Sequence, residues 1–207
     1  DQYLEFLEYL AVPYPPLEWN IGQWAGEPAW QAEWISPFER QIAAIVIATS
    51  KPEKDWLPER WAAVCDSLYS DYGLQPVLVG GRSARELDAE RIIRERATTP
   101  IRAELGSGLR KLISILDASA LVLAPDTGPL HMAVAMNRPV ISLLGYTNPK
   151  RTGPYRRFHD LMIDAYANDG EDYVPTMENR PGRMPRITVD DVLARVDVWR
   201  QRYSASR

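Results

Sequence analysis

The sequence predicts an α/β fold, a Rossmann-like parallel sheet with helices on both faces. The first reason is a set of short apolar runs rich in β-branched residues, of which QIAAIVIATS at 41–50 is the clearest. A strand that is apolar throughout is typical of a parallel sheet, because both of its faces are buried. The second reason is that helical patterns alternate with these runs, as the crossovers of a parallel sheet require.

The N-terminal segment differs from the rest of the chain. Leucines at helical spacing predict a short amphipathic helix over residues 1–10. Residues 13–37 are rich in proline and tryptophan, and we expect an ordered linker that lays its aromatic rings against the flank of the core. Contact with a membrane or a partner domain is the alternative for these rings. The tryptophans concerned are Trp19, Trp24, Trp30 and Trp34.

From residue 41 onward, strands and helices alternate. Pro58 suits the first turn of a helix, where its missing N–H is not needed. Ser83 precedes Glu86 by the spacing of a capping box, and Thr188 is a suitable cap for the last helix. Strands are expected at 41–50, 75–81, 120–128 and 138–145, with shorter ones at 101–103 and 161–163. Helices are expected at 58–73, 83–97, 107–119, 131–137 and 188–203.

This pattern divides the chain into three parts. Residues 1–40 are expected to form an interdomain helix and a Trp/Pro-rich linker, 41–187 the Rossmann-like domain, and 188–207 a C-terminal helix and tail. Within the domain, the polar residues 164–187 predict a long loop. The chain starts at Asp1 rather than at a methionine, which favours a piece of a longer protein, although a processed chain would look the same.

Composition limits the classes of partner. The net charge is −4, with 24 Lys and Arg against 28 Asp and Glu. The chain therefore lacks the basic field that holds a nucleic-acid backbone, and a nucleotide partner is expected to be a small molecule. The single cysteine, Cys65, excludes an internal disulfide and predicts a buried, inert thiol. The sequence shows no metal-ligand cluster and no apolar run of membrane-spanning length, so a cytoplasmic protein is expected.

The segment 126–131 has the composition of an anion site. Ligands of an open parallel sheet bind at the carboxyl ends of its strands, and this segment follows the strand expected at 120–128. Gly128 allows close approach of the backbone, and the amides of Leu130 and His131 are expected to face a phosphate at the start of a helix. Asp126 suits sugar hydroxyls or the bracing of loop amides. The alternative is an ordinary capped turn.

Other strand ends carry small residues, hydroxyls and cations. Thr49, Ser50 and Lys54 follow the first strand, and Lys54 is a candidate for phosphate contact or a solvated surface lysine. The pair Gly80 and Gly81 follows the second strand and gives room for a base or ribose, unless it is only a tight turn. A dinucleotide dehydrogenase and a P-loop NTPase are disfavoured, because neither G-x-G-x-x-G after the first strand nor G-x-x-x-x-G-K-[ST] is present.

One long stretch resembles a known signature. DASALVLAPDTGPLHMAVAMNRPVISLLGYTNPKRTGP, at 117–154, resembles the ADP-heptose:lipopolysaccharide heptosyltransferases, glycosyltransferase family 9. The family pattern is D-[TS]-G-x-x-H-x-A-A-A, then x-P, a strand, G-x-T-x-P and a later G-P. ATSKPEKDWLPERWAAV, at 48–64, is similar to the family segment in which a hydroxyl pair and a lysine precede a tryptophan. This chain departs from the family in lacking H-P-G in its first loop and in having Val134 for an alanine.

The resemblance implies the C-terminal, donor-binding half of a GT-B glycosyltransferase, in which two Rossmann-like domains face a cleft. It implies that Thr49, Ser50 and Lys54 bind the diphosphate region of the donor. It further implies that the loop from Ser107 to Leu109 lies against adenine. The residues implied to hold the diphosphate and the sugar are Asp126, Thr127, Gly128 and His131.

The implied activity is transfer of heptose from ADP-heptose to the lipopolysaccharide core, with inversion and without a required metal or other cofactor. The family's general base is an aspartate of the N-terminal half, which this sequence lacks, so we name no catalytic residue. The acceptor is expected to bind through that half, and the protein to work in the cytoplasm, with peripheral association at the cytoplasmic face of the inner membrane. The alternative is a non-catalytic nucleotide-binding or scaffold module with the same fold.

Overall fold

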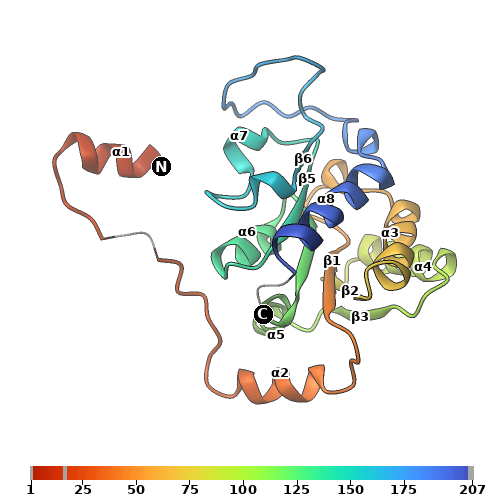
Figure 1. The fold of residues 1–207 in the computed structure, drawn as a ribbon. Coiled ribbons are helices and arrows are strands. Elements are labelled where there is room, and N and C mark those ends of the chain that lie inside the picture. The colour runs from red at the N-terminus through yellow and green to blue at the C-terminus, as the bar shows by residue number, and fades with distance from the viewer. Residues whose placement is uncertain (1, 16–17, 205–207) are drawn as a thin grey trace.

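A computed structural model describes residues 2–15 and 18–204 and confirms the α/β fold. Its centre is a six-stranded parallel sheet with the strand order β3-β2-β1-β4-β5-β6 (Figure 1). In this doubly wound order the chain builds one half of the sheet outward from β1 and then returns to build the other half from β4. The strands are β1 (Ile42–Val46), β2 (Gln75–Gly80), β3 (Arg102–Leu105), β4 (Leu121–Pro125), β5 (Val140–Leu144) and β6 (Met162–Asp164).

Helices cover both faces of the sheet (Figure 1). On one face α3 lies against α4 and α8, whereas α5 lies against α6 and α2. The helix after β4 starts at Gly128 and not at the expected residue 131, so the glycine and proline of that turn are already helical. The helices are α1 (Gln2–Tyr9), α2 (Glu27–Ile35), α3 (Pro58–Ser70), α4 (Ala84–Arg96), α5 (Leu109–Ala118), α6 (Gly128–Ala135), α7 (Pro149–Thr152) and α8 (Val189–Arg202).

The central strands are buried along their whole length. Every residue of β1, β4 and β5 is buried, which explains why these segments are apolar throughout. β1 lies between two partners, with Ala44 paired to Val77 of β2 and to Val122 of β4. The edge strand β3 is only partly buried and exposes Arg102. The core therefore sits around β1 and β4, the two strands that also separate the halves of the sheet.

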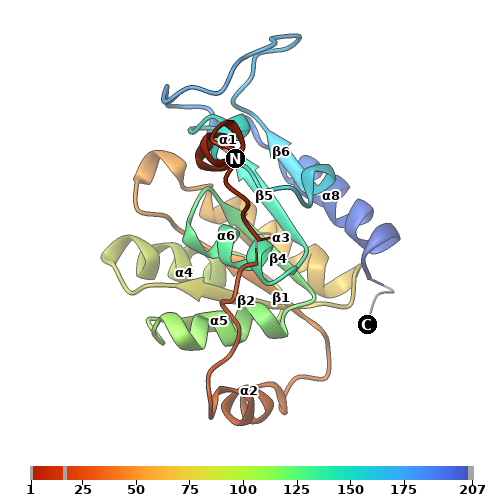
Figure 2. The same cartoon turned by 90° about the vertical axis from the view of Figure 1, so that its left-hand side faces the viewer.

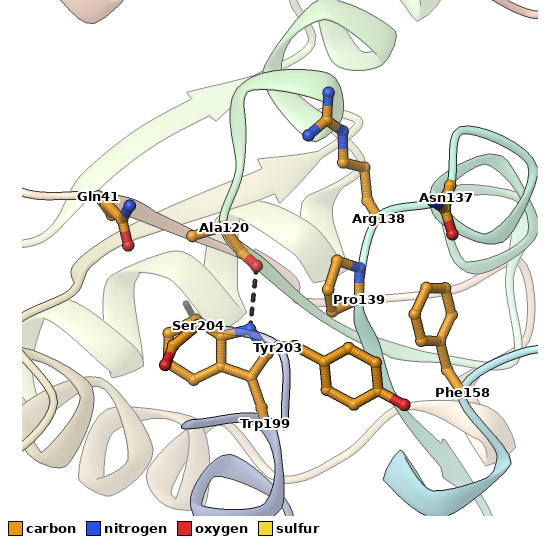
Figure 3. Close-up of a pocket in the computed structure, with 9 residues that line it drawn as sticks. All are labelled: Gln41, Ala120, Asn137, Arg138, Pro139, Phe158, Trp199, Tyr203 and Ser204. Atoms are coloured by element: carbon orange, nitrogen blue, oxygen red, sulfur yellow. Dashed lines mark hydrogen bonds between the residues drawn. The ribbon is translucent and has the colours of Figure 1, made fainter. Parts of the chain in front are cut away.

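The last helix is anchored to the sheet by Trp199. Its indole N–H donates to the carbonyl of Ala120, just before β4, at 3.1 Å (Figure 3). The Trp199 side chain is 3% exposed and lines a pocket of about 340 Å³ with Gln41 and Pro139. The lining residues Gln41, Ala120 and Pro139 directly precede β1, β4 and β5, so this pocket lies at the amino edge of the sheet. Open α/β sheets bind their ligands at the opposite, carboxyl edge.

Several local predictions are confirmed. Ser83 and Glu86 form a reciprocal capping box at the start of α4, and Thr188 forms another with Asp191 at the start of α8. Cys65 lies buried in α3, and burial raises the pKa of its thiol. The thiol is therefore neutral and shielded, as expected for an inert cysteine.

Helix α2 corrects the expectation that residues 13–37 form a linker alone. Its aromatic residues Trp30 and Trp34 stack with ring centroids 5.9 Å apart, and both pack against the core. Trp19 and Trp24 behave differently, since they are 56% and 66% exposed. Both still touch the domain, Trp19 at the ring of Tyr155 and Trp24 at the guanidinium of Arg110, so the partly buried pair covers the core and the exposed pair lies on its surface.

The two N-terminal helices lie far apart, with α1 level with the upper part of the domain and α2 below the sheet (Figure 2). The predicted long loop runs from the end of β6 to a 3-10 turn at Met184–Arg186. An ion pair of 2.6 Å between Arg180 and Glu171 joins two parts of this loop, and a β-bridge between Asn179 and Thr147 connects the loop to the segment after β5. Among the described helices, none combines the length and the apolar character that crossing a bilayer requires.

Candidate functional site

Lys54 and Asp126 are in contact at the point between β1 and β4 where the strand order of the sheet reverses. Lys54 ends the 3-10 turn that follows β1, and Asp126 directly follows β4. The Lys54 Nζ atom is 2.7 Å from Asp126 Oδ2, and the two side chains are 16% and 9% exposed. The crossovers from β1 and β4 run to opposite sides, which opens a crevice between their carboxyl ends, the usual ligand site of this fold. The structure thus brings two predicted site residues into contact.

Asp126 is the centre of this cluster. Besides Lys54, its carboxylate accepts a hydrogen bond of 2.6 Å from the hydroxyl of Thr147, and its Oδ1 atom lies 3.7 Å from His131 Nε2. Burial raises the pKa of Asp126, but the donors His131, Lys54 and Thr147 outweigh burial and hold the pKa at about 2. Asp126 is therefore ionised at neutral pH, and its carboxylate binds the ammonium of Lys54 and lies within ion-pair distance of the imidazole of His131.

The turn after β4 leads directly into α6. Thr127 is the N-cap of this helix, and Gly128 and Pro129 lie in its first turn. The amide of Leu130 donates to the carbonyl of Thr127 at 3.1 Å, which corrects the expectation that Leu130 presents a bare amide. Pro129 has no N–H, so the Gly128 amide and the positive end of the helix dipole are what the first turn offers an anion.

Thr49 and Ser50 follow β1 on the other side of the crevice. The carboxylate of Asp55 accepts from the amide of Thr49 at 2.7 Å and from its hydroxyl at 2.8 Å. Arg85, from α4, completes the arrangement with an ion pair of 2.6 Å to Asp55. Burial raises the pKa of Asp55 despite these partners. The hydroxyl of Thr49 is already engaged within its own loop, whereas Ser50 is exposed at the lip of the site.

A pocket of about 480 Å³ lies beside this cluster, between the carboxyl ends of the strands and the first turns of α5 and α6. Most of its wall is apolar, with Val46, Leu109 and Leu112 as the larger contributors. A flat, partly apolar group such as a nucleobase suits a pocket of this character. The predicted site residues that line it are Thr49, Ser50, Gly80, Gly81, Leu109 and Thr127.

Two glycines shape the far wall of this pocket. Gly106 and Gly108 have φ angles of 70° and 90°, in the left-handed region that side chains avoid. A Cβ atom at Gly106 would also lie 2.4 Å from the aliphatic stem of Arg82. Ser107, predicted to lie against adenine, sits between these glycines but does not line the pocket itself. Its neighbour Leu109 supplies the contact surface.

Glu86 brings a carboxylate to the same pocket. It accepts from the amide of Gly81 at 2.5 Å and from the hydroxyl of Ser83 at 2.6 Å. Burial raises its pKa, but the hydrogen bonds from Ser83 and Gly81 lower the pKa further, so the net shift is downward. This carboxylate is ionised and can accept hydrogen bonds from ligand hydroxyls. It stands next to the paired glycines that the sequence suggested for a base or ribose.

Four residues of the site were missed from the sequence. Glu86 was recognised only as a capping residue, and Thr147 only as a letter of the stretch 117–154 that resembles the family signature. Asp55 and Arg85 gave no signal, because their pairing joins a loop and a helix that are distant in the chain. Thr147 could have been found, since it is the threonine of the G-x-T-x-P pattern that follows the strand beside β4.

Comparisons with known proteins agree with this geometry. The model of glycosyltransferase family 9 (heptosyltransferase) matches residues 3–169. The lipopolysaccharide core heptosyltransferase OpsX of Haemophilus influenzae is 30% identical over 172 residues, which cover 83% of this chain and 49% of the relative.

Among solved structures, the family 9 glycosyl transferase of Veillonella parvula superposes with a TM-score of 0.76 at 22% identity, covering 96% of this chain and 58% of its own. The Escherichia coli heptosyltransferase WaaC, solved with ADP, gives a TM-score of 0.61 at 19% identity, covering 96% of this chain and 54% of its own.

These matches confirm the predicted fold and the predicted family. The structural likeness supports a Rossmann-like unit of the GT-B type, as the sequence indicated. The chain spans about half the length of the curated relative and of the solved structures that it matches. The family model, in contrast, covers most of this chain, including every residue of the Lys54–Asp126 cluster. The chain belongs to glycosyltransferase family 9, the heptosyltransferase family.

Proposed function

We propose that this chain is the donor-binding half of a heptosyltransferase that transfers heptose from ADP-heptose to a lipopolysaccharide core acceptor. The observation that carries the proposal is the Lys54–Asp126 ion pair at the switch point of the sheet, next to a pocket lined by residues of the family signature. The relative WaaC was solved with ADP, which supports a nucleoside diphosphate as the ligand class.

The donor fits this site in one direction. Adenine lies in the apolar pocket against Leu109, and the carboxylate of Glu86 accepts hydrogen bonds from the ribose hydroxyls. The diphosphate crosses the crevice between Ser50 and the first turn of α6, where the Gly128 amide and the helix dipole favour negative charge. This direction leaves the β-phosphate beside Lys54 and the sugar near Thr147 and the end of β5.

The proposed chemistry is a direct displacement. An acceptor hydroxyl attacks the anomeric carbon of the heptose, the bond from that carbon to the β-phosphate oxygen breaks, and the electron pair leaves with ADP. Negative charge grows on the β-phosphate as the bond breaks. Lys54 is held in place by Asp126 before the reaction and meets this charge with little reorganisation, and His131 lies beside it at the same carboxylate.

A displacement of this kind inverts the configuration at the anomeric carbon, and the ammonium of Lys54 supplies positive charge that a metal supplies elsewhere. The proton of the acceptor hydroxyl must go to a base outside this site. The acceptor is anchored in a membrane, so we place the reaction at the cytoplasmic face of the inner membrane. The sequence expectation of an acceptor bound through another domain is part of the same proposal.

Calorimetric titration with ADP tests the ligand. We expect binding to the unaltered chain, and a loss of affinity of about tenfold or more in Lys54→Ala, because a charge-assisted contact to phosphate is removed. His131→Ala should weaken binding in the same direction. Lys111→Ala is the matched control, because this lysine lies over the ring of Trp30, away from the crevice. Absence of ADP binding, or equal losses in Lys54→Ala and Lys111→Ala, would refute the proposal.

A further inference from the structure

The pair formed by Asp55 and Arg85 joins the loop after β1 to the first turn of α4 without lining the pocket. Arg85 Nε lies 2.6 Å from Asp55 Oδ2, and the side chains are 39% and 15% exposed. Asp55 directly follows Lys54 in the chain, whereas Arg85 lies in the first turn of α4. Neither residue belongs to the wall of the 480 Å³ pocket. The Asp55 side of the pair is thus shielded from solvent, and the pair lies outside the pocket wall.

The pair holds both polar backbone groups of Thr49. The amide of Thr49 donates to Asp55 at 2.7 Å, and the guanidinium of Arg85 donates to the carbonyl of Thr49. The hydroxyl of Thr49 also donates to Asp55, at 2.8 Å. With its amide, carbonyl and hydroxyl all engaged, Thr49 has a fixed orientation, and the following residue, Ser50, is presented to the crevice in one position.

The first turn of α4 also holds the backbone on the other side of the pocket. Glu86, the neighbour of Arg85, binds the amides of Gly81 and Ser83 and faces the pocket. The first turn of α4 therefore holds the Thr49–Ser50 segment through Arg85 and the paired glycines through Glu86. A displacement of either segment would change the width of the pocket between them.

We propose that Asp55 and Arg85 are positioning residues that hold the Thr49–Ser50 segment in the shape that receives the diphosphate of the donor. The inference rests on the proposed function, because it assigns the diphosphate to this segment. It predicts the direction in which removal of Asp55 changes the affinity for ADP, and this direction is opposite to the one that charge alone predicts. Asp55 is an anion close to an anion site, so its charge by itself opposes phosphate binding. If Asp55 acts by positioning, its removal weakens the binding of ADP.

The test compares ADP with adenosine, which has no phosphate, in titrations of the unaltered chain, Asp55→Ala and Arg85→Ala. We expect both variants to bind ADP about tenfold more weakly, the loss of one charge-assisted contact, and to bind adenosine within about twofold of the unaltered chain. Arg85→Lys keeps the charge but not the planar fork that reaches both Asp55 and the Thr49 carbonyl, so it should resemble Arg85→Ala.

Two controls separate positioning from folding. Arg91→Ala removes an arginine of the same helix whose ion pairs with Asp88 and Glu95 are exposed, and it should leave both affinities unchanged. Asp55→Asn is the fallback if Asp55→Ala does not fold, and it should weaken ADP binding as well. Unchanged or tighter ADP binding in the Asp55 variants, or full rescue by Arg85→Lys, overturns the inference while leaving the proposed function intact. Failure of the unaltered chain to bind ADP overturns both.

Discussion

Asp126 carries its negative charge inside the protein because three donors surround it. Lys54 and Thr147 make contacts of 2.7 Å and 2.6 Å to one carboxylate oxygen, and His131 approaches the other oxygen. The donors come from the 3-10 turn after β1, the segment after β5 and the beginning of α6, so a single side chain links three parts of the site. The negative charge of Asp126 allows Lys54 and His131 to lie close together at the proposed phosphate site.

The low pKa of Asp126 predicts a specific loss of stability in acid. The pKa falls from its ordinary value of 3.8 to about 2 in the folded protein. As the pH falls, the unfolded chain takes up this proton first, so the contribution of Asp126 is complete above about pH 5 and is lost as the pH approaches 2. The shift corresponds to about 2 kcal/mol. Urea unfolding between pH 5 and pH 2 measures the loss.

Asp126→Asn is the variant that isolates this effect. It cannot titrate, so its free energy of unfolding should fall about 2 kcal/mol less over that pH range than that of the unaltered protein. The two proteins must be compared because Glu171, which is paired with Arg180, also has a pKa of about 2 and contributes to the acid dependence of both. Parallel pH profiles for the two proteins would show that Asp126 is not the stabilised carboxylate described here.

At the scale of elements, the strands and the longer helices were predictable because burial and periodicity agree. β1, β4 and β5 are apolar throughout and buried throughout. Helix α2 was not predictable in the same way, because Pro28 was counted among loop residues although a proline in the first turn starts a helix. The signal that was overlooked is the pair Trp30 and Trp34, four residues apart on one face.

The sequence could predict those residues of the site that follow the carboxyl ends of strands. Lys54 and Asp126 could be placed in it because the carboxyl ends of neighbouring parallel strands meet. Their direct contact could not be foreseen, since it depends on the exact length of the 3-10 turn before Lys54. The bond from the Leu130 amide to Thr127 likewise depends on how tightly the first turn of α6 is wound. Such details are set by tertiary packing and not by the local pattern.

Two tryptophans give a matched test of element packing. Trp199 holds α8 against the sheet, with 3% exposure and a hydrogen bond to Ala120, whereas Trp24 is 66% exposed and lies over Arg110. Trp199→Ala should lower the free energy of unfolding by about 3–5 kcal/mol, and Trp24→Ala by less than about 1 kcal/mol. Urea unfolding measures both values. Equal losses would contradict the assignment of α8 as a core element and of Trp24 as a surface residue.

At the scale of the whole molecule, the carboxylates of the site are poorly suited to act as a general base. A general base at neutral pH needs a pKa near that pH. The carboxylates of Asp126 and Glu86 both have lowered pKa values, and each is engaged by several donors. These two carboxylates therefore do not supply the base that the proposed transfer to an acceptor hydroxyl needs.

We therefore predict that the 207-residue chain alone binds ADP without transferring sugar. Mass spectrometry of a lipopolysaccharide core acceptor, incubated with ADP-heptose and this chain, should show no added heptose. A complete family 9 heptosyltransferase in the same assay is the positive control. Product formed by this chain at a comparable rate would mean that a side chain described here acts as the base.

Ligand binding should also be visible in the stability of the entire domain. The site is assembled from loops after β1, β2, β4 and β5, so ADP can bind only the folded chain. At a concentration a hundredfold above its Kd, ADP should stabilise the fold by about 2.7 kcal/mol, which raises the Tm of a domain of this size by roughly 5–10 °C. Thermal unfolding with and without ADP measures the shift.

Two variants separate the stability of the fold from the binding of the ligand. Lys54→Ala should lose most of the ADP-dependent shift. Trp199→Ala should lower the Tm without ADP but keep the shift, because it lies at the amino edge of the sheet, in the other pocket. The opposite result, a shift kept in Lys54→Ala and lost in Trp199→Ala, would place the nucleotide in the pocket of Figure 3 and not at the carboxyl ends of the strands.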